Sequence, residues 1–351
     1  MNQNNANKAQ SWPLRIILEA GVNHEGSLSK ALEMVELAAS CGVYSIKFQT
    51  YKAETLAAIN SPRYWDPIKE PTQSQRELFS KYDSFGLNEY REIAQHCAKF
   101  NILFSTTFFD EKLLEEMDEL VTFHKIASAD ITNYRLIQEV AKRNKPILLS
   151  TGAATIQEVQ LAVRQITSIN KFLEVTLLHC VLNYPTEHHN ANLGRILVLK
   201  DEFPSLNVGY SDHTLPEYSE QAICTAYLFG ASVIETHFTF NKNLPGNDHY
   251  HALDASDVMR LRMKLNTLES MQRYDEKGFI ELQHEARLYA RRGVYAREEI
   301  KQGSKIFEDN LICLRPVPQN GYPASELKSI VGKYCLNDIK SGEAITKNDL
   351  S

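Results

Sequence analysis

The sequence predicts a (β/α)8 barrel followed by a small second domain. Short β-rich runs alternate with amphipathic stretches along most of the 351 residues. Eight strand–helix units over about 260 residues match the arithmetic of such a barrel. An open doubly wound sheet could hold as many strands, but no Gly-x-Gly-x-x-Gly motif follows the first run. The alternation then stops, so we expect a barrel over residues 14–275, a linker over 276–290 and a second domain over 291–351.

The eight predicted strands are short and rich in β-branched and aromatic residues. They cover residues 15–20, 45–50, 102–107, 123–128, 146–151, 174–180, 207–212 and 233–238. Amphipathic stretches between them, such as 27–40, 87–100 and 155–169, place apolar residues at three- and four-residue spacing, which is typical of helices. The first of these has Ser27 as a predicted N-cap and Gly42 as its stop.

The second domain contains a sequence repeat. Residues 299–311 and 338–350 match at a fixed offset of 39, and each copy reads acidic-Ile-Lys-x-Gly-x-x-Ile before a polar turn and a leucine. Two copies predict a pseudo-twofold domain of short strands and turns. A core of about 60 residues is marginal by itself, so docking onto a partner surface would stabilise it.

Composition excludes several classes of protein. Apolar residues make up 43% and charged residues 23%, as in soluble globular proteins, and the net charge of −6 argues against general nucleic-acid or anionic-membrane binding. No apolar run approaches the roughly 18 residues that span a bilayer, and the polar N-terminus lacks the apolar core of a signal peptide. Six scattered cysteines without a Cys-x-x-Cys fit reduced thiols, so we expect a cytoplasmic protein.

Polar residues gather where the predicted strands end. Active sites of (β/α)8 barrels lie at the C-terminal ends of the strands, so these side chains are candidates for chemistry. They are Glu19, Lys47, Gln49, Thr106, Lys125, Ser128, Ser150, His179, Ser211, His213, Glu235 and His237. Polar strand ends that merely meet water do not readily explain two lysines and two histidines in neighbouring units.

The two histidines suit a metal, and the lysines suit an anion. His213 and His237 end adjacent strands, so their imidazoles can converge on a divalent transition metal, although each could equally be a hydrogen-bonding residue or a proton donor. Lys47 and Lys125 can bind an anion as point charges, or one can form a Schiff base with a carbonyl substrate. The neighbouring hydroxyls favour the anion, because phosphate oxygens accept many hydrogen bonds.

Taken in order, the motifs resemble those of the N-acetylneuraminate (sialic acid) synthase family, whose members also make related nonulosonic acids. The similarity runs from residue 14 to the end and includes an antifreeze-like (SAF) domain with Arg315-Pro316 and Gly321-Tyr322. The motifs in the barrel are Glu19–Gly26, Lys47–Thr50, Ser105–Thr107, Lys125–Ser128, Leu149–Gly152, Leu178–Cys180, Tyr184-Pro185, Gly209–Thr214 and Glu235–His237.

This resemblance implies a condensation of phosphoenolpyruvate with an N-acyl hexosamine, with release of phosphate. It assigns His213 and His237 to a divalent ion, manganese by default and magnesium or cobalt as alternatives, and Glu19, Lys47 and Lys125 to catalysis. Glu19 would orient the sugar or serve the water that attacks C2. The implied substrate-binding residues are Gln49, Thr106, Ser128, Ser150, Tyr184, Ser211, Asp248 and Arg315. The resemblance further implies a homodimer with swapped SAF domains, in which Arg315 reaches the partner's barrel near the N-acyl group.

The sugar and two other classes of function stay open at the level of sequence. Leu182 and Thr107 depart from the family pattern, which leaves the identity of the hexosamine open. N-acetylmannosamine is the default substrate, and a diacetamido-trideoxyhexose, leading to legionaminic- or pseudaminic-type acids, is the rival. A Schiff-base aldolase and a non-catalytic carbohydrate-binding barrel are the alternatives. We expect Trp65 to lie in a loop that covers the site. Six further histidines are left out of the site as loop or supporting residues: His24, His179, His188, His189, His249 and His251.

Overall fold

The chain divides into two compact units. The computed structural model describes residues 13–65, 67–68, 70–246 and 248–351. The first unit ends at Met271 and the second runs from Gln272 to Ser351. Within the described ranges, no helix has the length and apolar character needed to cross a bilayer.

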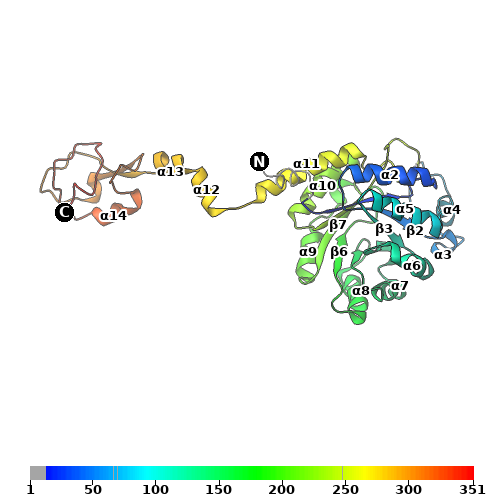
Figure 1. Cartoon of the computed structure of the whole chain (residues 1–351). Coiled ribbons are helices and arrows are strands. Elements are labelled where there is room, and N and C mark those ends of the chain that lie inside the picture. Colours follow the sequence, from blue (N-terminus) through cyan, green and yellow to red (C-terminus); the bar gives the residue numbers. More distant parts are fainter. Residues whose placement is uncertain (1–12, 66, 69, 247) are drawn as a thin grey trace. The chain divides into compact units, whose positions relative to one another are not determined.

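Eight parallel strands of the first unit close into a barrel in chain order, which confirms the predicted fold (Figure 1). Neighbouring strands pair in register, as in Glu19 opposite Lys47 and Lys47 opposite Ser105. The strands are β1 (Arg15–Gly21), β2 (Ser45–Thr50), β3 (Leu103–Phe108), β4 (His124–Ile126), β5 (Ile147–Ser150), β6 (Val175–His179), β7 (Asn207–Asp212) and β8 (Val233–His237). The predicted fourth strand is shortened, because its last residue, Ser128, begins a 3-10 turn.

Helices surround the barrel (Figure 1). As predicted, the Ser27 hydroxyl caps the first of them by accepting the Lys30 amide hydrogen, and Gly42 follows its end with a φ of +66°. The helices are α2 (Leu28–Ser40), α3 (Ala53–Leu56), α4 (Gln75–Ser80), α5 (Leu87–Lys99), α6 (Glu111–Met117), α7 (Tyr134–Ala141), α8 (Ile156–Ile169), α9 (Arg195–Glu202), α10 (Pro216–Leu228) and α11 (Ala255–Gln272). Short 3-10 helices are η1 (Asp118–Leu120), η2 (Ser128–Asp130) and η3 (His188–Asn190).

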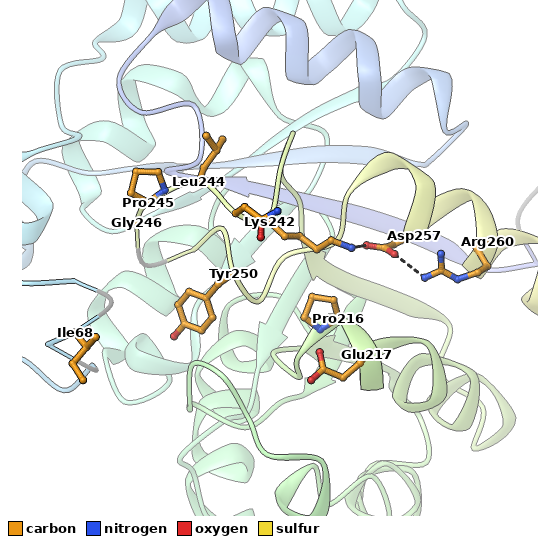
Figure 2. Close-up of a pocket in the computed structure, with 11 residues that line it drawn as sticks. Ile68, Pro216, Glu217, Lys242, Leu244, Pro245, Gly246, Tyr250, Asp257 and Arg260 are labelled. Carbon is orange, nitrogen blue, oxygen red and sulfur yellow. Dashed lines mark hydrogen bonds and ion pairs between the residues drawn. The ribbon is translucent and has the colours of Figure 1, made fainter.

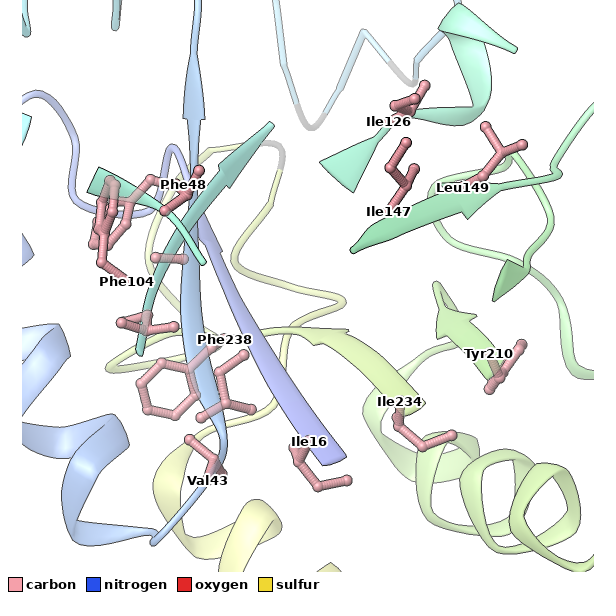
Figure 3. Close-up of a cluster of buried hydrophobic side chains, with 14 of the residues drawn as sticks. Ile16, Val43, Phe48, Phe104, Ile126, Ile147, Leu149, Tyr210, Ile234 and Phe238 are labelled. Atoms are coloured by element: carbon pink, nitrogen blue, oxygen red, sulfur yellow. The ribbon is translucent and has the colours of Figure 1, made fainter. Parts of the chain in front are cut away.

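Side chains alternate between the inside and the outside of the barrel along each strand. Outward residues such as Ile16, Phe48 and Ile234 pack against the helices in a large apolar cluster, part of which Figure 3 shows. Inward residues at the start of the strands form a smaller cluster that fills the floor of the barrel: Ile17, Phe123, Leu148, Leu178 and Val233. Further along the same strands, the inward positions carry the polar residues of the candidate site. Strand parity therefore determines which side chains reach that site.

A glycine on β7 lets the floor close. A Cβ atom at Gly209 would lie 2.5 Å from the Val233 carbonyl oxygen and 2.6 Å from Leu178 Cδ2. Both contacts are far below van der Waals distance, so any larger residue here would push the floor residues apart. The packed floor leaves the open end of the barrel as the place for a ligand.

The second unit has the predicted pseudo-twofold arrangement. Ile300 and Ile339, which occupy equivalent positions of the repeat, exchange backbone hydrogen bonds of 2.8 and 2.9 Å. The equivalent residues Ile306 and Ile345 share one apolar core with Leu311 and Leu350. The elements are α12 (Glu276–Leu282), α13 (His284–Ala290), β9 (Gly293–Ala296), η4 (Glu308–Asn310), β10 (Leu311–Leu314), η5 (Ala324–Glu326) and α14 (Leu327–Ile330). The expected linker thus forms two short helices, which are largely exposed.

Candidate active site

A cavity of about 340 Å³ lies at the C-terminal ends of the barrel strands. Eleven of the thirteen residues predicted for the site line it, and the two exceptions are Thr106 and Arg315. The eleven are Glu19, Lys47, Gln49, Lys125, Ser128, Ser150, Tyr184, Ser211, His213, His237 and Asp248. The strand ends therefore bring together groups that are up to about 230 positions apart in the sequence.

Lys47 and Glu19 form a buried ion pair on β2 and β1. Lys47 Nζ lies 2.5 Å from Glu19 Oε2 and donates a hydrogen bond of 3.0 Å to Thr107 Oγ1. Gln49 Nε2 donates to the other oxygen of Glu19 at 2.9 Å. Burial alone would lower the pKa of Lys47, but the carboxylates of Glu19 and Glu235 outweigh this effect and raise it. Burial raises the pKa of Glu19, against the opposing effect of Lys47. Glu19 is thereby suited to accept a proton.

Glu235 on β8 lies between the two lysines, a role that the sequence prediction did not assign. Its carboxylate is 3.6 Å from Lys125 Nζ and 3.8 Å from Lys47 Nζ, and it accepts a hydrogen bond of 2.9 Å from Ser211 Oγ. Burial opposes its ionisation, but Lys125 and Lys47 together lower the pKa of Glu235 to about 2. The pKa of Lys125 is lowered by burial and by the charge of Lys47, against the effect of Glu235. Because Glu235 ends a strand beside His237, its position alone could have suggested it.

Hydroxyl and amide donors occupy the wall beside Lys125. Ser128 Oγ lies 2.9 Å from Cys180 Sγ and accepts the Gly152 amide hydrogen at 2.9 Å. Within the described part of the chain, the buried Ser150 hydroxyl has no hydrogen-bond partner. An added Cβ at Gly152 would lie 2.8 Å from both Ser128 Oγ and Cys180 Sγ, so the glycine keeps this wall open. A buried hydroxyl without a partner costs free energy unless a ligand satisfies it, so this wall fits an oxygen-rich anion.

The structure does not bring Thr106 into the cavity. Its hydroxyl points to the helix side of β3 and lies 2.7 Å from Thr50 Oγ1. Strand parity explains the difference, since Ser105 and Thr107 face inward opposite Lys47 and Gln49. Thr107, one of the two residues that depart from the family pattern, lines the cavity in its place. His179 faces outward for the same reason, and its Nε2 lies 2.9 Å from the Ala191 carbonyl oxygen.

Histidines surround the Tyr184 ring on another part of the wall. The centroid of the His213 ring lies 4.2 Å from that of Tyr184 and 5.5 Å from that of His237. His213 Nδ1 is 2.7 Å from the Val181 carbonyl oxygen, which can only accept, so this nitrogen carries the proton and Nε2 keeps its lone pair. Burial lowers the pKa of His213 to about 4 and that of His237 well below its usual value. Both imidazoles are neutral at pH 7, as metal ligands must be.

A third histidine joins this group, although the sequence prediction left it out. His237, Asp248 and His251 each offer one ligand atom, and these three atoms lie within 4.8 Å of one another. The two histidines are buried, with His251 2% exposed, and the Asp248 side chain is 12% exposed. His251 lies beyond the end of β8, in the loop that leads to α11, so no strand-end rule could have found it. The Asp248–His251 spacing of three residues was the available signal.

Aromatic and apolar side chains line the outer part of the cavity. Trp65 lines it as expected and donates its indole hydrogen to the Glu70 carbonyl oxygen at 3.0 Å. Glu70 in turn pairs with Lys81 at 2.7 Å, which fixes the segment that carries Trp65. The other outer residues are Tyr51, Leu56, Tyr64, Leu78, Phe79, Tyr82, Phe109 and Leu182. Among the described lining residues, Lys47 and Lys125 are the lysine or arginine cations, and both lie at strand ends.

A second, more open pocket of about 770 Å³ shares Gly246 with the main cavity (Figure 2). Its charged groups neutralise one another, since Lys242 Nζ lies 2.5 Å from the Asp257 carboxylate and Arg260 Nη2 lies 2.7 Å from it. Tyr250 donates its hydroxyl hydrogen to the Tyr184 carbonyl oxygen at 3.0 Å, which ties the loop between the two pockets to the main site. We therefore assign the candidate active site to the main cavity.

Arg315 belongs to the second unit, where its side chain is exposed and lines a pocket of that unit. Its assignment to the partner's active site stays a prediction.

Comparison with known proteins identifies the family. The NeuB family model matches residues 34–277, and the SAF domain model matches residues 291–351. The chain belongs to the NeuB family. This membership confirms the resemblance read from the strand-end motifs and from the C-terminal repeat.

Relatives of this NeuB-family protein are similar over nearly their whole length. An N,N'-diacetyllegionaminic acid synthase from Campylobacter jejuni is 34% identical over 334 residues, which cover 94% of this chain and 98% of the relative. A synthase of the same name from Legionella pneumophila is 33% identical, with coverages of 96% and 95%. The crystal structure of a sialic acid synthetase from Leptospira borgpetersenii is 30% identical with a TM-score of 0.67, and the match covers 78% of this chain and 91% of that one.

Proposed function

We propose that this protein is a nonulosonic acid synthase, which joins phosphoenolpyruvate to the aldehyde carbon of an N-acyl hexosamine and releases phosphate. One observation carries the proposal: a single cavity holds two walls of different chemistry. The lysine–hydroxyl wall consists of Lys47, Lys125, Thr107, Ser128 and Ser150, and the histidine–carboxylate wall consists of His213, His237 and Asp248. The first wall fits the phosphate and carboxylate of phosphoenolpyruvate, and the second fits a divalent ion and a polar sugar. The family membership and the names of the relatives support the same reaction.

The lysine–hydroxyl wall would bind the phosphate and carboxylate groups of phosphoenolpyruvate. Lys47 and Lys125, together with Thr107, Ser128 and Ser150, supply the donors for phosphoenolpyruvate. Each hydrogen bond to a charged group contributes about 1.5–3 kcal/mol, so this set binds the anion without a glycine-rich loop. Glu235 lies within 4 Å of both lysines, and its carboxylate opposes the effect of burial on the pKa of each.

The reaction forms one carbon–carbon bond and breaks one carbon–oxygen bond. The double-bond electrons of phosphoenolpyruvate attack the sugar aldehyde from C3, which leaves C2 positively charged. Water adds to C2 as Glu19 removes its proton, and the C2–O bond to phosphate then breaks with its electron pair on oxygen. Of the two protons lost by water, one ends on the former aldehyde oxygen and the other on phosphate.

The histidine wall fits a divalent ion, with manganese as the proposed metal. Neutral His213, with its Nε2 lone pair available, and neutral His237 are the proposed ligands. When bound, the ion would polarise the sugar aldehyde as a Lewis acid. Tyr184 and Asp248 line the same wall, where Tyr184 would contact the sugar and the Asp248 carboxylate lies beside His237.

The proposed sugar is a diacetamido-trideoxyhexose, with N-acetylmannosamine as the alternative. Its methyl group and second acetamido group suit the apolar lining residues from the segment between β2 and β3, which include Leu56 and Trp65. The two relatives described above are named for a diacetylated legionaminic acid, which supports this choice. The scarcity of cations on the described outer wall argues against a sugar phosphate.

Product analysis tests the proposed function. The protein is incubated with Mn²⁺, phosphoenolpyruvate and each sugar of a panel, and products are identified by mass spectrometry alongside phosphate release. We expect one nonulosonic acid per phosphate released, the highest rate with the diacetamido sugar, and no product after chelation until Mn²⁺ is restored. His237→Ala is the inactive control. Phosphate release without a sugar-derived product would contradict the proposal.

A Schiff-base aldolase is the second candidate, because burial lowers the pKa of Lys125, as such a nucleophile requires. Borohydride reduction in the presence of a carbonyl substrate distinguishes the two functions. A trapped lysine adduct would support the aldolase. Full inactivation by a chelator, with no adduct formed, would support the synthase.

We further propose a homodimer in which the SAF domain of one protomer completes the site of the other. The second unit has a small core of its own, and it begins with two short helices that carry exposed apolar side chains such as Phe279, Leu282 and Tyr289. Arg315 is exposed on this unit, and its guanidinium can donate to the carbonyl oxygen of the sugar's N-acyl group.

A further inference from the structure

His251 has the position of a metal ligand. After β8, the chain leaves the barrel as a loop and returns to it: the Leu253 amide donates to the His237 carbonyl oxygen at 2.9 Å, and the Thr239 amide donates to the Leu253 carbonyl oxygen at 3.0 Å. These two bonds fasten the end of the loop beside the end of the strand. The His251 and His237 rings are therefore close, with centroids 4.6 Å apart.

The three side chains are arranged as metal ligands are. The ligand atoms of His237, Asp248 and His251 lie within 4.8 Å of one another. Three ligands that are about 2.0–2.2 Å from a common ion and on one side of it lie roughly 3 Å apart, so these atoms would move closer together, by at most about 2 Å, when the ion binds. Two imidazoles and one carboxylate on one side of an ion leave positions open for substrate oxygens.

The position of Asp248 supports the same reading. Its carboxylate Oδ2 lies 3.8 Å from His237 Nδ1, and the Asn23 amide holds its backbone by donating to the Asp248 carbonyl oxygen at 3.3 Å. Asn23 also donates to the Phe238 carbonyl oxygen at 2.9 Å, so one side chain joins the loop to the strand end. A negative carboxylate beside two imidazoles favours a cation at this point.

We propose that His251 is an additional protein ligand of the divalent ion, acting with His237 and Asp248 beside the predicted ligand His213. The inference rests on the proposed function only in taking the ion to be part of the site. It assigns a role to a histidine in the loop after β8, beyond the two at the strand ends. A site with this many protein ligands holds its ion before any substrate binds.

Metal binding without substrates tests the inference. Mn²⁺ affinity is measured by titration with detection by electron paramagnetic resonance, and pulsed measurements count the coordinated imidazole nitrogens. For His251→Ala we expect an affinity at least roughly tenfold weaker than for the natural chain, and one fewer nitrogen. His251→Asp, which restores an oxygen ligand, should recover part of the affinity but not the nitrogen.

Two controls separate ligation from general damage. Tyr250→Phe removes the neighbouring hydrogen bond to Tyr184 and tests whether disturbing the loop weakens metal binding. His284→Ala removes an exposed histidine from α13 of the second unit. Both should bind Mn²⁺ like the natural chain, and all variants should retain their melting temperatures.

The outcomes are distinct. An unchanged nitrogen count and affinity in His251→Ala would overturn the inference, and so would equal weakening in Tyr250→Phe. Absence of Mn²⁺ binding by the natural chain would overturn both the inference and the proposed metal. If the chain binds Mn²⁺ through His251 but forms no product with any sugar, the proposed function fails and the inference stands.

Discussion

Two adjacent threonines on β3 offer a sharp test of strand parity. Thr107 faces the cavity and accepts a hydrogen bond of 3.0 Å from Lys47 Nζ, whereas Thr106 faces the helices and pairs with Thr50 at 2.7 Å. Valine has nearly the same shape as threonine but lacks the hydroxyl. Thr106→Val and Thr107→Val therefore make the same chemical change on opposite faces of one strand.

The expected effects differ in kind. Thr107→Val removes the hydroxyl that is proposed to donate to the bound anion, a hydrogen bond worth about 1.5–3 kcal/mol, so phosphoenolpyruvate affinity should fall roughly ten- to a hundred-fold. Thr106→Val leaves the Thr50 hydroxyl buried without its partner, which should lower the free energy of unfolding by about 1–3 kcal/mol while affinity stays within about twofold.

Calorimetric titration with phosphoenolpyruvate and urea denaturation measure the two quantities. Both variants are compared with the natural chain at one pH and one metal concentration. If Thr106→Val weakens binding as much as Thr107→Val does, the parity reasoning is refuted.

Three further predictions concern the anion site, the dimer and pH. Lys125→Ala should weaken phosphoenolpyruvate binding strongly in calorimetry and sugar binding little, whereas equal losses would mean that the lysine does not serve the anion. Mixing Arg315→Ala chains with His213→Ala chains, each inactive alone, should partly restore activity if the site is shared between protomers; confirmed subunit exchange without recovery would place the arginine elsewhere. Burial lowers the pKa of His124 to about 4, against 6.5 when unfolded. The unfolded chain thus takes up this proton first, so the stability that His124 contributes is full above pH 6.5 and is lost as pH falls to about 4. Denaturation at several pH values should show this slope, and His124→Gln should flatten it.

Strand positions were predictable from the sequence, but the direction of a side chain depends on register. Apolar runs and their polar ends located the barrel and most of the cavity, because strand ends of a barrel share one face. Thr106 was misplaced because Ser105, Thr106 and Thr107 are all small and polar, so the residues themselves do not reveal which face they occupy. Pairing with β2 decides it, since Lys47 and Gln49 face inward.

Residues in loops were beyond the reach of the same reasoning. His251 reaches the site because backbone hydrogen bonds return the loop after β8 to the strand end, and such long-range bonds leave no local pattern. Glu235 could have been assigned, since it precedes His237 by two residues and therefore faces the same side of β8. The repeat of the second unit was visible because equivalent apolar residues, such as Ile300 and Ile339, meet in one core.

The quartet of Lys47, Lys125, Glu19 and Glu235 carries its own counter-ions. Each of the two lysines has at least one of the two carboxylates within 4 Å inside the cavity. An incoming anion must therefore compete with these carboxylates for the lysines. This competition favours a ligand that carries several negative charges and accepts many hydrogen bonds at once, as phosphoenolpyruvate does.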